Sequence, residues 1–247
     1  KSLEELLSKA EYYTPSQTFT IPAGETQTTT FTGLSGQKFG INRILPGGTG
    51  LDKVKITVKT NNGRDTVLPP VFCETVRKLF LSRSIQGAII LGTGSEAEVT
   101  VENTDSQAHK VNIELLGFDT AQLEQKQEKF ESRGLPFPNV EFLTAQTTLA
   151  AGATEQRESL SMPAFKTRLY RIAMSSDSPE NVLVSLMQNK TKIKDEVFLS
   201  QINDEFGDMR IILPQTLKAN EPFDIFLTNL DQSNSHNVSC LGETYRI

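Results

Sequence analysis

The chain contains no tryptophan, only two histidines and only two cysteines in 247 residues, and these shortages exclude several functions. A small β-barrel metalloenzyme places several histidines and a carboxylate around one ion, and two imidazoles cannot supply such a set. Cys73 and Cys240 lack the spacing of a zinc site, and we interpret them as buried free thiols rather than a disulfide. The sequence therefore predicts no metal and no cofactor.

Long apolar runs and charge runs of one sign are missing as well. No stretch approaches the roughly 20 apolar residues that cross a bilayer, and no signal peptide is recognised. The net charge of −5 and the pI near 5.3 argue against direct contact with nucleic acid. P-loop, dinucleotide and GxSxG motifs are absent, and nothing favours a Ser-His-Asp triad. We expect a soluble, non-enzymatic protein made in a reducing compartment.

The chain does contain one unit written twice. Residues 20–61 recur without a gap at 148–189, at an offset of 128 residues. Nine positions are identical in this register: Thr20/Thr148, Ala23/Ala151, Gly24/Gly152, Thr26/Thr154, Lys38/Lys166, Arg43/Arg171, Ile44/Ile172, Val54/Val182 and Asn61/Asn189. A period this long indicates a duplicated domain rather than a solenoid of short units.

The turn before the last predicted strand also recurs, and it carries the two histidines. In each half an Asn, an Asp two residues later and a His follow one another, at Asn103, Asp105 and His109 and at Asn229, Asp231 and His236. Side chains at this spacing commonly cap their own turn, and the alternative is that they offer oxygen ligands to calcium. We favour the turn interpretation and place both histidines at the start of a strand without a ligand role.

Short alternating runs predict an all-β body. Val54, Ile56 and Val58 alternate with polar residues, which is the two-residue period of a strand with one wet face. Eight strands are expected in each half, near 17–21, 27–32, 37–45, 53–60, 64–68, 86–91, 96–103 and 109–117, and near 141–148, 155–161, 165–175, 181–189, 192–195, 208–213, 222–229 and 236–243. Eight antiparallel strands in two facing sheets is the jelly-roll count, and the Cys–Trp–Cys core of an immunoglobulin domain is lacking. We predict two tandem eight-stranded jelly-roll barrels.

Helix-like segments interrupt the β pattern. Residues 1–13 place apolar side chains on one helical face, and Ser2 and Glu5 have the spacing of a capping box. Helix-like inserts at Val71–Ser82 and Asp195–Phe206 occupy equivalent places between the fifth and sixth strands. The predicted domains are an N-terminal amphipathic helical arm at 1–16, a first jelly roll at 17–118, a polar helical linker at 119–138 and a second jelly roll at 139–247.

This order of helical arm, barrel, linker and second barrel, with one helical insert in each barrel, resembles the double jelly-roll major capsid proteins. That family builds icosahedral, internal-membrane viruses, including tectiviruses, corticoviruses and flavobacterial phages. The resemblance is architectural and covers nearly the whole chain. It implies a virion protein, made in the host cytoplasm, whose trimers form pseudo-hexagonal tiles of a capsid shell.

The resemblance also implies partners and an interface. Partners would be two further copies in a homotrimer, neighbouring capsomers, penton or minor capsid proteins and an underlying viral membrane. The N-terminal arm would contact a neighbouring capsomer or the membrane through Leu3, Leu6, Leu7, Tyr12 and Tyr13. The alternative is that this helix packs on its own barrel.

Two other functions remain open at this stage. One is a carbohydrate- or receptor-binding viral spike or lectin-like protein of two β-sandwiches. Sugar sites usually present aromatic platforms, and a chain without tryptophan and with four tyrosines is poor in them. The other is a degenerate two-barrel enzyme, which the missing catalytic motifs disfavour.

Overall fold

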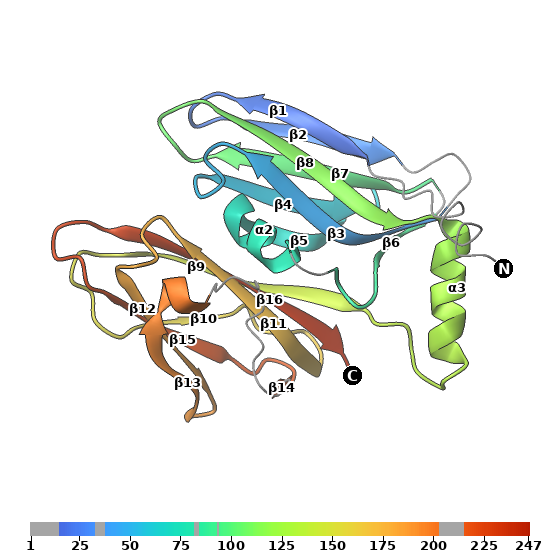
Figure 1. Cartoon of the computed structure of the whole chain (residues 1–247). Helices are drawn as coiled ribbons and strands as arrows, with labels where there is room; N and C mark the ends of the chain where they lie inside the picture. Colours follow the sequence, from blue (N-terminus) through green and yellow to red (C-terminus); the bar gives the residue numbers. More distant parts are fainter. Residues whose placement is uncertain (1–14, 33–37, 82–83, 93, 203–214) are drawn as a thin grey trace, which may run out of the picture.

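The computed structural model describes residues 15–32, 38–81, 84–92, 94–202 and 215–247. In these residues sixteen strands form four sheets of four strands, two sheets in each half of the chain (Figure 1). The residues 1–14, including the predicted helix at 1–13, lie outside the described part.

The first barrel contains the strands β1 (Ser16–Ile21), β2 (Thr26–Thr32), β3 (Phe39–Gly48), β4 (Val54–Thr60), β5 (Asp65–Phe72), β6 (Ile89–Leu91), β7 (Glu96–Asn103) and β8 (His109–Phe118). They pair in the order β1-β8-β3-β6 in one sheet and β2-β7-β4-β5 in the other. All of these pairs are antiparallel.

The second barrel contains β9 (Val140–Leu149), β10 (Gln156–Ser159), β11 (Thr167–Ser176), β12 (Val182–Gln188), β13 (Thr191–Phe198), β14 (Gln215–Leu217), β15 (Phe223–Asn229) and β16 (His236–Arg246). One sheet has the order β14-β11-β16-β9 and the other the order β10-β15-β12-β13. Adding eight to each strand number of the first barrel reproduces these two sheets. The predicted fold, two tandem eight-stranded jelly rolls from an internal duplication, is confirmed.

The repeated identities include turn residues with a left-handed backbone. Gly24 and Gly152 have φ angles of 68° and 65°, and Asn61 and Asn189 have φ angles of 53° and 49°. Glycine adopts this region without a Cβ clash, and asparagine is among the residues that tolerate it best. Part of the sequence identity between the halves therefore reflects the geometry of equivalent turns.

Each barrel has its own apolar core, formed by alternate residues of its strands. The side chains of Val54, Ile56 and Val58 on β4 are completely buried, as the alternation predicts. The equivalent strand β12 buries Val182 and Val184 in the same way. Full burial of such a side chain contributes about 1.5–3 kcal/mol, so these cores are the main source of stability in both barrels.

The strand β5 is longer than predicted, because it continues through Pro69 and Pro70 to Phe72. A proline cannot donate a hydrogen bond to the ladder, but β5 is an edge strand and pairs on one side only. Its register with β4 shifts between Ile56 and Val58, where the two prolines stand opposite a single residue. The bulge accommodates the proline pair and lets the strand resume.

Both predicted helical inserts begin later than expected. The first is α2 (Cys73–Phe80), since Val71 still belongs to β5. The second was predicted from Asp195, but residues 195–198 remain in β13, where Val197 pairs with Val184. The helix there is α4 (Leu199–Ile202), and 203–206 lie outside the described residues. The strand predicted at 208–213 also lies outside them, and the short strand β14 follows at 215–217.

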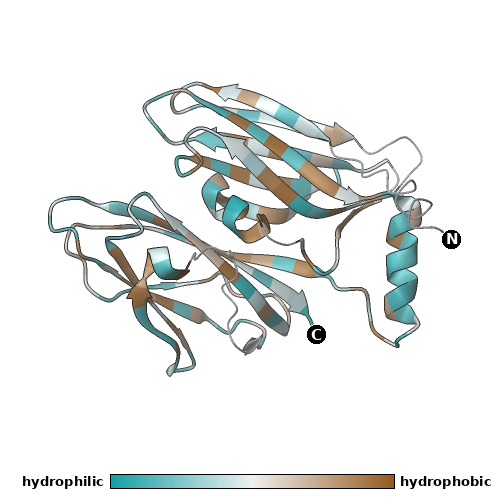
Figure 2. Cartoon of the chain, in the orientation of Figure 1, coloured by the Kyte–Doolittle hydropathy of each residue, from teal (hydrophilic) through white to brown (hydrophobic). Residues whose placement is uncertain are grey.

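A helix, α3 (Thr120–Glu131), connects β8 to β9 and stands beside the first barrel (Figure 1). Asp119 and Gln122 form a capping box at its start, with Asp119 Oδ1 accepting from the Gln122 backbone N–H at 2.8 Å. Leu123 is its one buried residue and packs with Ala88 and Phe118. The rest of the helix surface is mostly hydrophilic (Figure 2). The domain boundaries at 118 and 139 stay a prediction.

Candidate assembly surfaces

The predicted interface residues Leu3, Leu6, Leu7, Tyr12 and Tyr13 lie outside the described residues, so their role stays a prediction. The described residues show a different surface, the contact between the two barrels of one chain. Sequence reasoning did not identify this contact, although the repeated Arg43 and Arg171 proved to be part of it.

The helix α2 lies between the two barrels (Figure 1). Its buried residues Val76, Leu79 and Phe80 belong to the core of the first barrel. Ala173 and Leu241 of the second barrel, which are 3% and 0% exposed, join that same apolar cluster. The helix therefore serves as a wedge whose two sides pack on different barrels.

An aromatic pair and two polar contacts also join the barrels. The rings of Phe80 and Phe142 meet edge to face, with centroids 6.0 Å apart. The hydroxyl oxygens of Thr75 on α2 and Ser175 on β11 lie 2.6 Å apart, and both residues are buried. Buried hydroxyls without a partner would destabilise the fold, so this pair fixes the position of the helix on the second barrel.

Two arginines related by the repeat meet at the C-terminal end of α2. Arg43 Nε donates to the carbonyl oxygen of Phe80 at 2.6 Å, and its Nη2 donates to that of Leu81. Arg171, from the second barrel, donates from Nη1 to the carbonyl oxygen of Leu79 at 3.2 Å. The last carbonyls of a helix carry partial negative charge, so two cations are favourable at this end.

Arg171 also forms a buried ion pair. Its Nε lies 2.5 Å from Glu243 Oε2, and the two side chains are 4% and 0% exposed. The hydroxyl of Tyr245 donates to the other oxygen of Glu243 and accepts from the Gln86 backbone N–H at 2.7 Å. Burial, with the adjacent Glu243 carboxylate, raises the pKa of Tyr245. This network links β16 of the second barrel to the first barrel through hydrogen bonds to charged groups.

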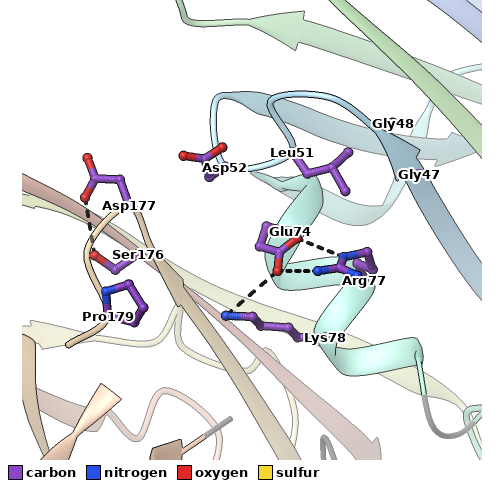
Figure 3. A pocket seen from close by; sticks show the side chains of 10 residues that line it. All are labelled: Gly47, Gly48, Leu51, Asp52, Glu74, Arg77, Lys78, Ser176, Asp177 and Pro179. Atoms are coloured by element: carbon purple, nitrogen blue, oxygen red, sulfur yellow. Dashed lines mark hydrogen bonds and ion pairs between the residues drawn. The ribbon is translucent and has the colours of Figure 1, made fainter. Parts of the chain in front are cut away.

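A polar cleft of about 550 Å³ lies at the edge of the barrel contact (Figure 3). Glu74 accepts hydrogen bonds from Arg77 Nε at 2.9 Å and Nη2 at 2.8 Å, and it lies 3.9 Å from Lys78 Nζ. Across the cleft, Asp177 of the second barrel lies 3.4 Å from Lys53 Nζ of the first. The charged groups of the cleft pair with one another, as in the polar rim of an interface.

The repeated asparagines hold equivalent turns. Asn103 Nδ2 donates to the carbonyl oxygens of Ile21, Pro22 and Gln107, at 3.1, 3.0 and 2.7 Å. Its Oδ1 accepts from the backbone N–H of Asp105 at 3.0 Å. These bonds agree with the turn-capping interpretation of the sequence.

Asn229 makes the corresponding bonds to Ala150 and Asn234, at 2.9 Å each, and to the backbone N–H of Asp231. Like Asn103, it is 1% exposed. We expect Asn229→Ala to lower the free energy of unfolding by about 1–3 kcal/mol, because it leaves buried carbonyls without a donor. Urea denaturation would measure the change, with Gln232→Ala in the same exposed turn as the matched control. Equal stability of the two variants would contradict the prediction.

Each histidine contacts the aspartate of its own turn. His109 Nε2 lies 2.8 Å from Asp105 Oδ2, and His236 Nε2 lies 3.2 Å from Asp231 Oδ2. His236 Nδ1 also lies 3.2 Å from Oδ1 of Asp177, which is the cleft residue that faces Lys53. Within the described residues no group of three or more His, Cys, Asp or Glu side chains is placed to hold a metal ion.

The Asp231 carboxylate gives a pH dependence whose sign follows from its contacts. Hydrogen bonds from the Asn234 side chain and from the Ser233 backbone lower the pKa of Asp231 from 3.8 to about 2. The unfolded chain therefore binds this proton more readily than the folded one, and stability is lost as the pH falls from about 4 to about 2. We expect Asp231→Asn to flatten the loss in that window, measured by denaturation at each pH. Asp195→Asn, at an 87% exposed side chain, is the control and should keep the wild-type slope.

Cys73 and Cys240 are free and buried, which confirms the prediction for the two cysteines. Burial raises the pKa of both thiols, so neither is activated as a nucleophile. None of the helices in the described part of the chain combines the length and apolar character needed to cross a membrane.

Solved structures with the same arrangement come from viral capsids. A chain in the atomic structure of Sulfolobus Turreted Icosahedral Virus is similar over 96% of this chain and 91% of its own length, with a TM-score of 0.51 and 13% identity. This chain has the double jelly-roll fold. The fold similarity to double jelly-roll major capsid proteins that the sequence predicted is thus confirmed.

Two further solved structures are similar over nearly their whole length. The major capsid protein of the same virus gives a TM-score of 0.48 at 12% identity, over 96% of this chain and 97% of its own. The major capsid protein P2 from bacteriophage PM2 gives 0.45 at 10% identity, over 94% and 97%. No protein-family model and no curated protein sequence matches the chain. At these identities the likeness concerns the fold alone.

Proposed function

We propose that this chain is a structural virion protein, a double jelly-roll major capsid protein without enzymatic activity. Its trimers would form pseudo-hexagonal tiles of an icosahedral shell, because three copies of two like barrels give six similar wedges around a three-fold axis. The observation that carries the proposal is the barrel contact itself. Two jelly rolls of one topology are joined through a buried wedge helix and a buried ion pair, as a fixed building block requires.

The proposal includes partners that match such a block. Closed barrels hide most sheet edges, so assembly would use chosen faces and loops rather than strand addition. The partners are two further copies, neighbouring capsomers, penton or minor capsid proteins and an internal membrane, with the mature protein located in the virion. The acidic net charge of −5 fits a shell protein that does not bind nucleic acid directly.

The mass of the purified protein in solution tests this function. We expect sedimentation or light scattering to give a trimer of about 82 kDa, three times the chain mass of 27.3 kDa. A stable monomer that binds a defined glycan on an array would instead support the carbohydrate-binding alternative. Turnover of a substrate by the pure protein would refute the non-enzymatic assignment.

The N-terminal arm has a separate test. We propose that Leu3, Leu6, Leu7, Tyr12 and Tyr13 bind a neighbouring capsomer or the membrane. Deleting residues 1–13 should leave folded trimers with an unchanged melting temperature but abolish assembly into shells, seen by electron microscopy. A loss of folding on deletion would place the segment in the core of its own barrel, against the proposal.

A further inference from the structure

The contact between the barrels joins two different faces of the jelly roll. The second barrel contributes the outer face of its sheet, with Ala173 on β11 and Leu241 on β16. The first barrel contributes its side, formed by β5 and α2. Because the barrels are copies of one unit, each possesses both an outer face and a side. Within one chain, the first barrel uses only its side and the second barrel only its outer face.

The outer face of the first barrel is therefore the unused equivalent of a buried surface. The repeat aligns Leu45 on β3 with Ala173 and Leu116 on β8 with Leu241. Ala173 and Leu241 are almost fully buried by the first barrel, whereas Leu45 and Leu116 remain partly exposed. Next to them, β1 exposes Thr18 and other polar side chains. This face is formed by neighbouring strands in the order β1, β8, β3, just as β9, β16, β11 form its counterpart.

The side of the second barrel is the other unused surface. It is formed by β13 and α4, the counterparts of β5 and α2. The sequence Val-Phe ends both fifth strands, at Phe72 and Phe198. Phe72 is 8% exposed, but Phe198 is 38% exposed, although the two stand at the same place in the fold. Likewise Thr75 is completely buried, while its counterpart Gln201 is exposed.

We propose that these two surfaces bind each other between copies of this chain. The outer face β1-β8-β3 of one copy would receive the side β13-α4 of a second copy, in the geometry already present within each chain. Such a contact joins unlike faces, so it propagates from copy to copy and closes when the rotation permits a ring. The inference rests on the proposed trimer, since three chains then repeat one barrel contact six times.

The repeat specifies which residues should meet. Within the chain, Thr75 and Ser175 are in hydrogen-bond contact, and their counterparts are Gln201 and Gly47. Gln201 of one copy should therefore lie beside Gly47 of the next. A Cβ added at Gly47 would meet no atom within 4 Å, so a cysteine is tolerated there in the isolated chain.

A disulfide between introduced cysteines tests the contact. We expect Gly47→Cys with Gln201→Cys, under mild oxidation, to give covalent trimers on non-reducing gels, because a disulfide requires Cβ atoms about 3.5–4.5 Å apart. The matched control is Thr75→Cys with Ser175→Cys, which should form a disulfide within one chain and no covalent oligomer. Neither single variant should crosslink into trimers, and the native cysteines are buried.

The outcomes separate this contact from the proposed function. Trimers in solution without the Gly47–Gln201 crosslink would overturn the contact and leave the capsid assignment standing. A monomer without the crosslink would overturn both. As a second test, Leu116→Lys should convert the trimer to monomer with the circular dichroism spectrum unchanged. Thr30→Lys, on the exposed face of the opposite sheet, should leave the trimer intact. A trimeric Leu116→Lys protein would contradict the proposal.

Discussion

Replacing Arg171 with alanine is expected to lower the free energy of unfolding by about 3–5 kcal/mol. The substitution leaves Glu243, whose side chain is fully buried, as a charge without its partner in a low-dielectric interior. It also removes the donor to the Leu79 carbonyl at the end of α2. For a chain of this size the melting temperature should fall by about 6–20 °C.

Two controls isolate the buried pair from a general effect of losing an arginine. Arg157 pairs with Asp224 at 2.9 Å, but its side chain is 59% exposed, so Arg157→Ala should cost less than about 1 kcal/mol. Replacing both members, as in Arg171→Met with Glu243→Leu, should recover much of the loss, because no buried charge then remains. If Arg171→Ala and Arg157→Ala had equal effects in urea denaturation, the pair would not be buried in the folded protein.

The second large effect is expected at Phe80, where alanine should destabilise the protein by about 3–5 kcal/mol. Phe80 is fully buried at the end of α2 and packs against Phe142 of the second barrel. The substitution therefore opens a cavity where the two barrels meet. Phe165→Ala, at a 47% exposed ring, provides the surface comparison and should change stability little.

A double-mutant cycle separates the barrel contact from simple loss of core volume. Phe80→Ala and Phe142→Ala should be coupled by about 0.5–1.5 kcal/mol, the usual range for an aromatic pair. Phe223 is equally buried but belongs to the separate core of the second barrel. Phe80→Ala and Phe223→Ala should therefore add within about 0.5 kcal/mol. Coupling of equal size in both cycles would contradict a direct role for the Phe80–Phe142 contact.

The barrel contact explains why one insert helix differs from the other. α2 spans Cys73–Phe80 and is buried on both sides, whereas its counterpart α4 covers only Leu199–Ile202. The first lies between two barrels of one chain, and the second lies at the free side of the second barrel. The duplicated unit thus shows one contact in its satisfied form and the same surfaces in their unsatisfied form.

The sequence by itself determined the features that depend on neighbouring residues and on the repeat. Alternation in Val54, Ile56 and Val58 gave the strands, and the shared Gly24 and Asn61 marked equivalent left-handed turns. These signals are local, because side-chain alternation and turn conformation are set within a few residues. The offset of 128 residues then predicted the second barrel from the first.

Only the tertiary structure decided how the barrels meet. Nothing adjacent in sequence links Thr75 to Ser175 or Arg171 to Glu243, which are separated by 100 and 72 residues. Nor could local pattern show that β5 continues through two prolines, since that depends on its place at a sheet edge. A polar residue in a strand looks the same whether it faces water or another barrel. The difference arises only when a distant segment excludes the water, and here the wedge helix α2 does so.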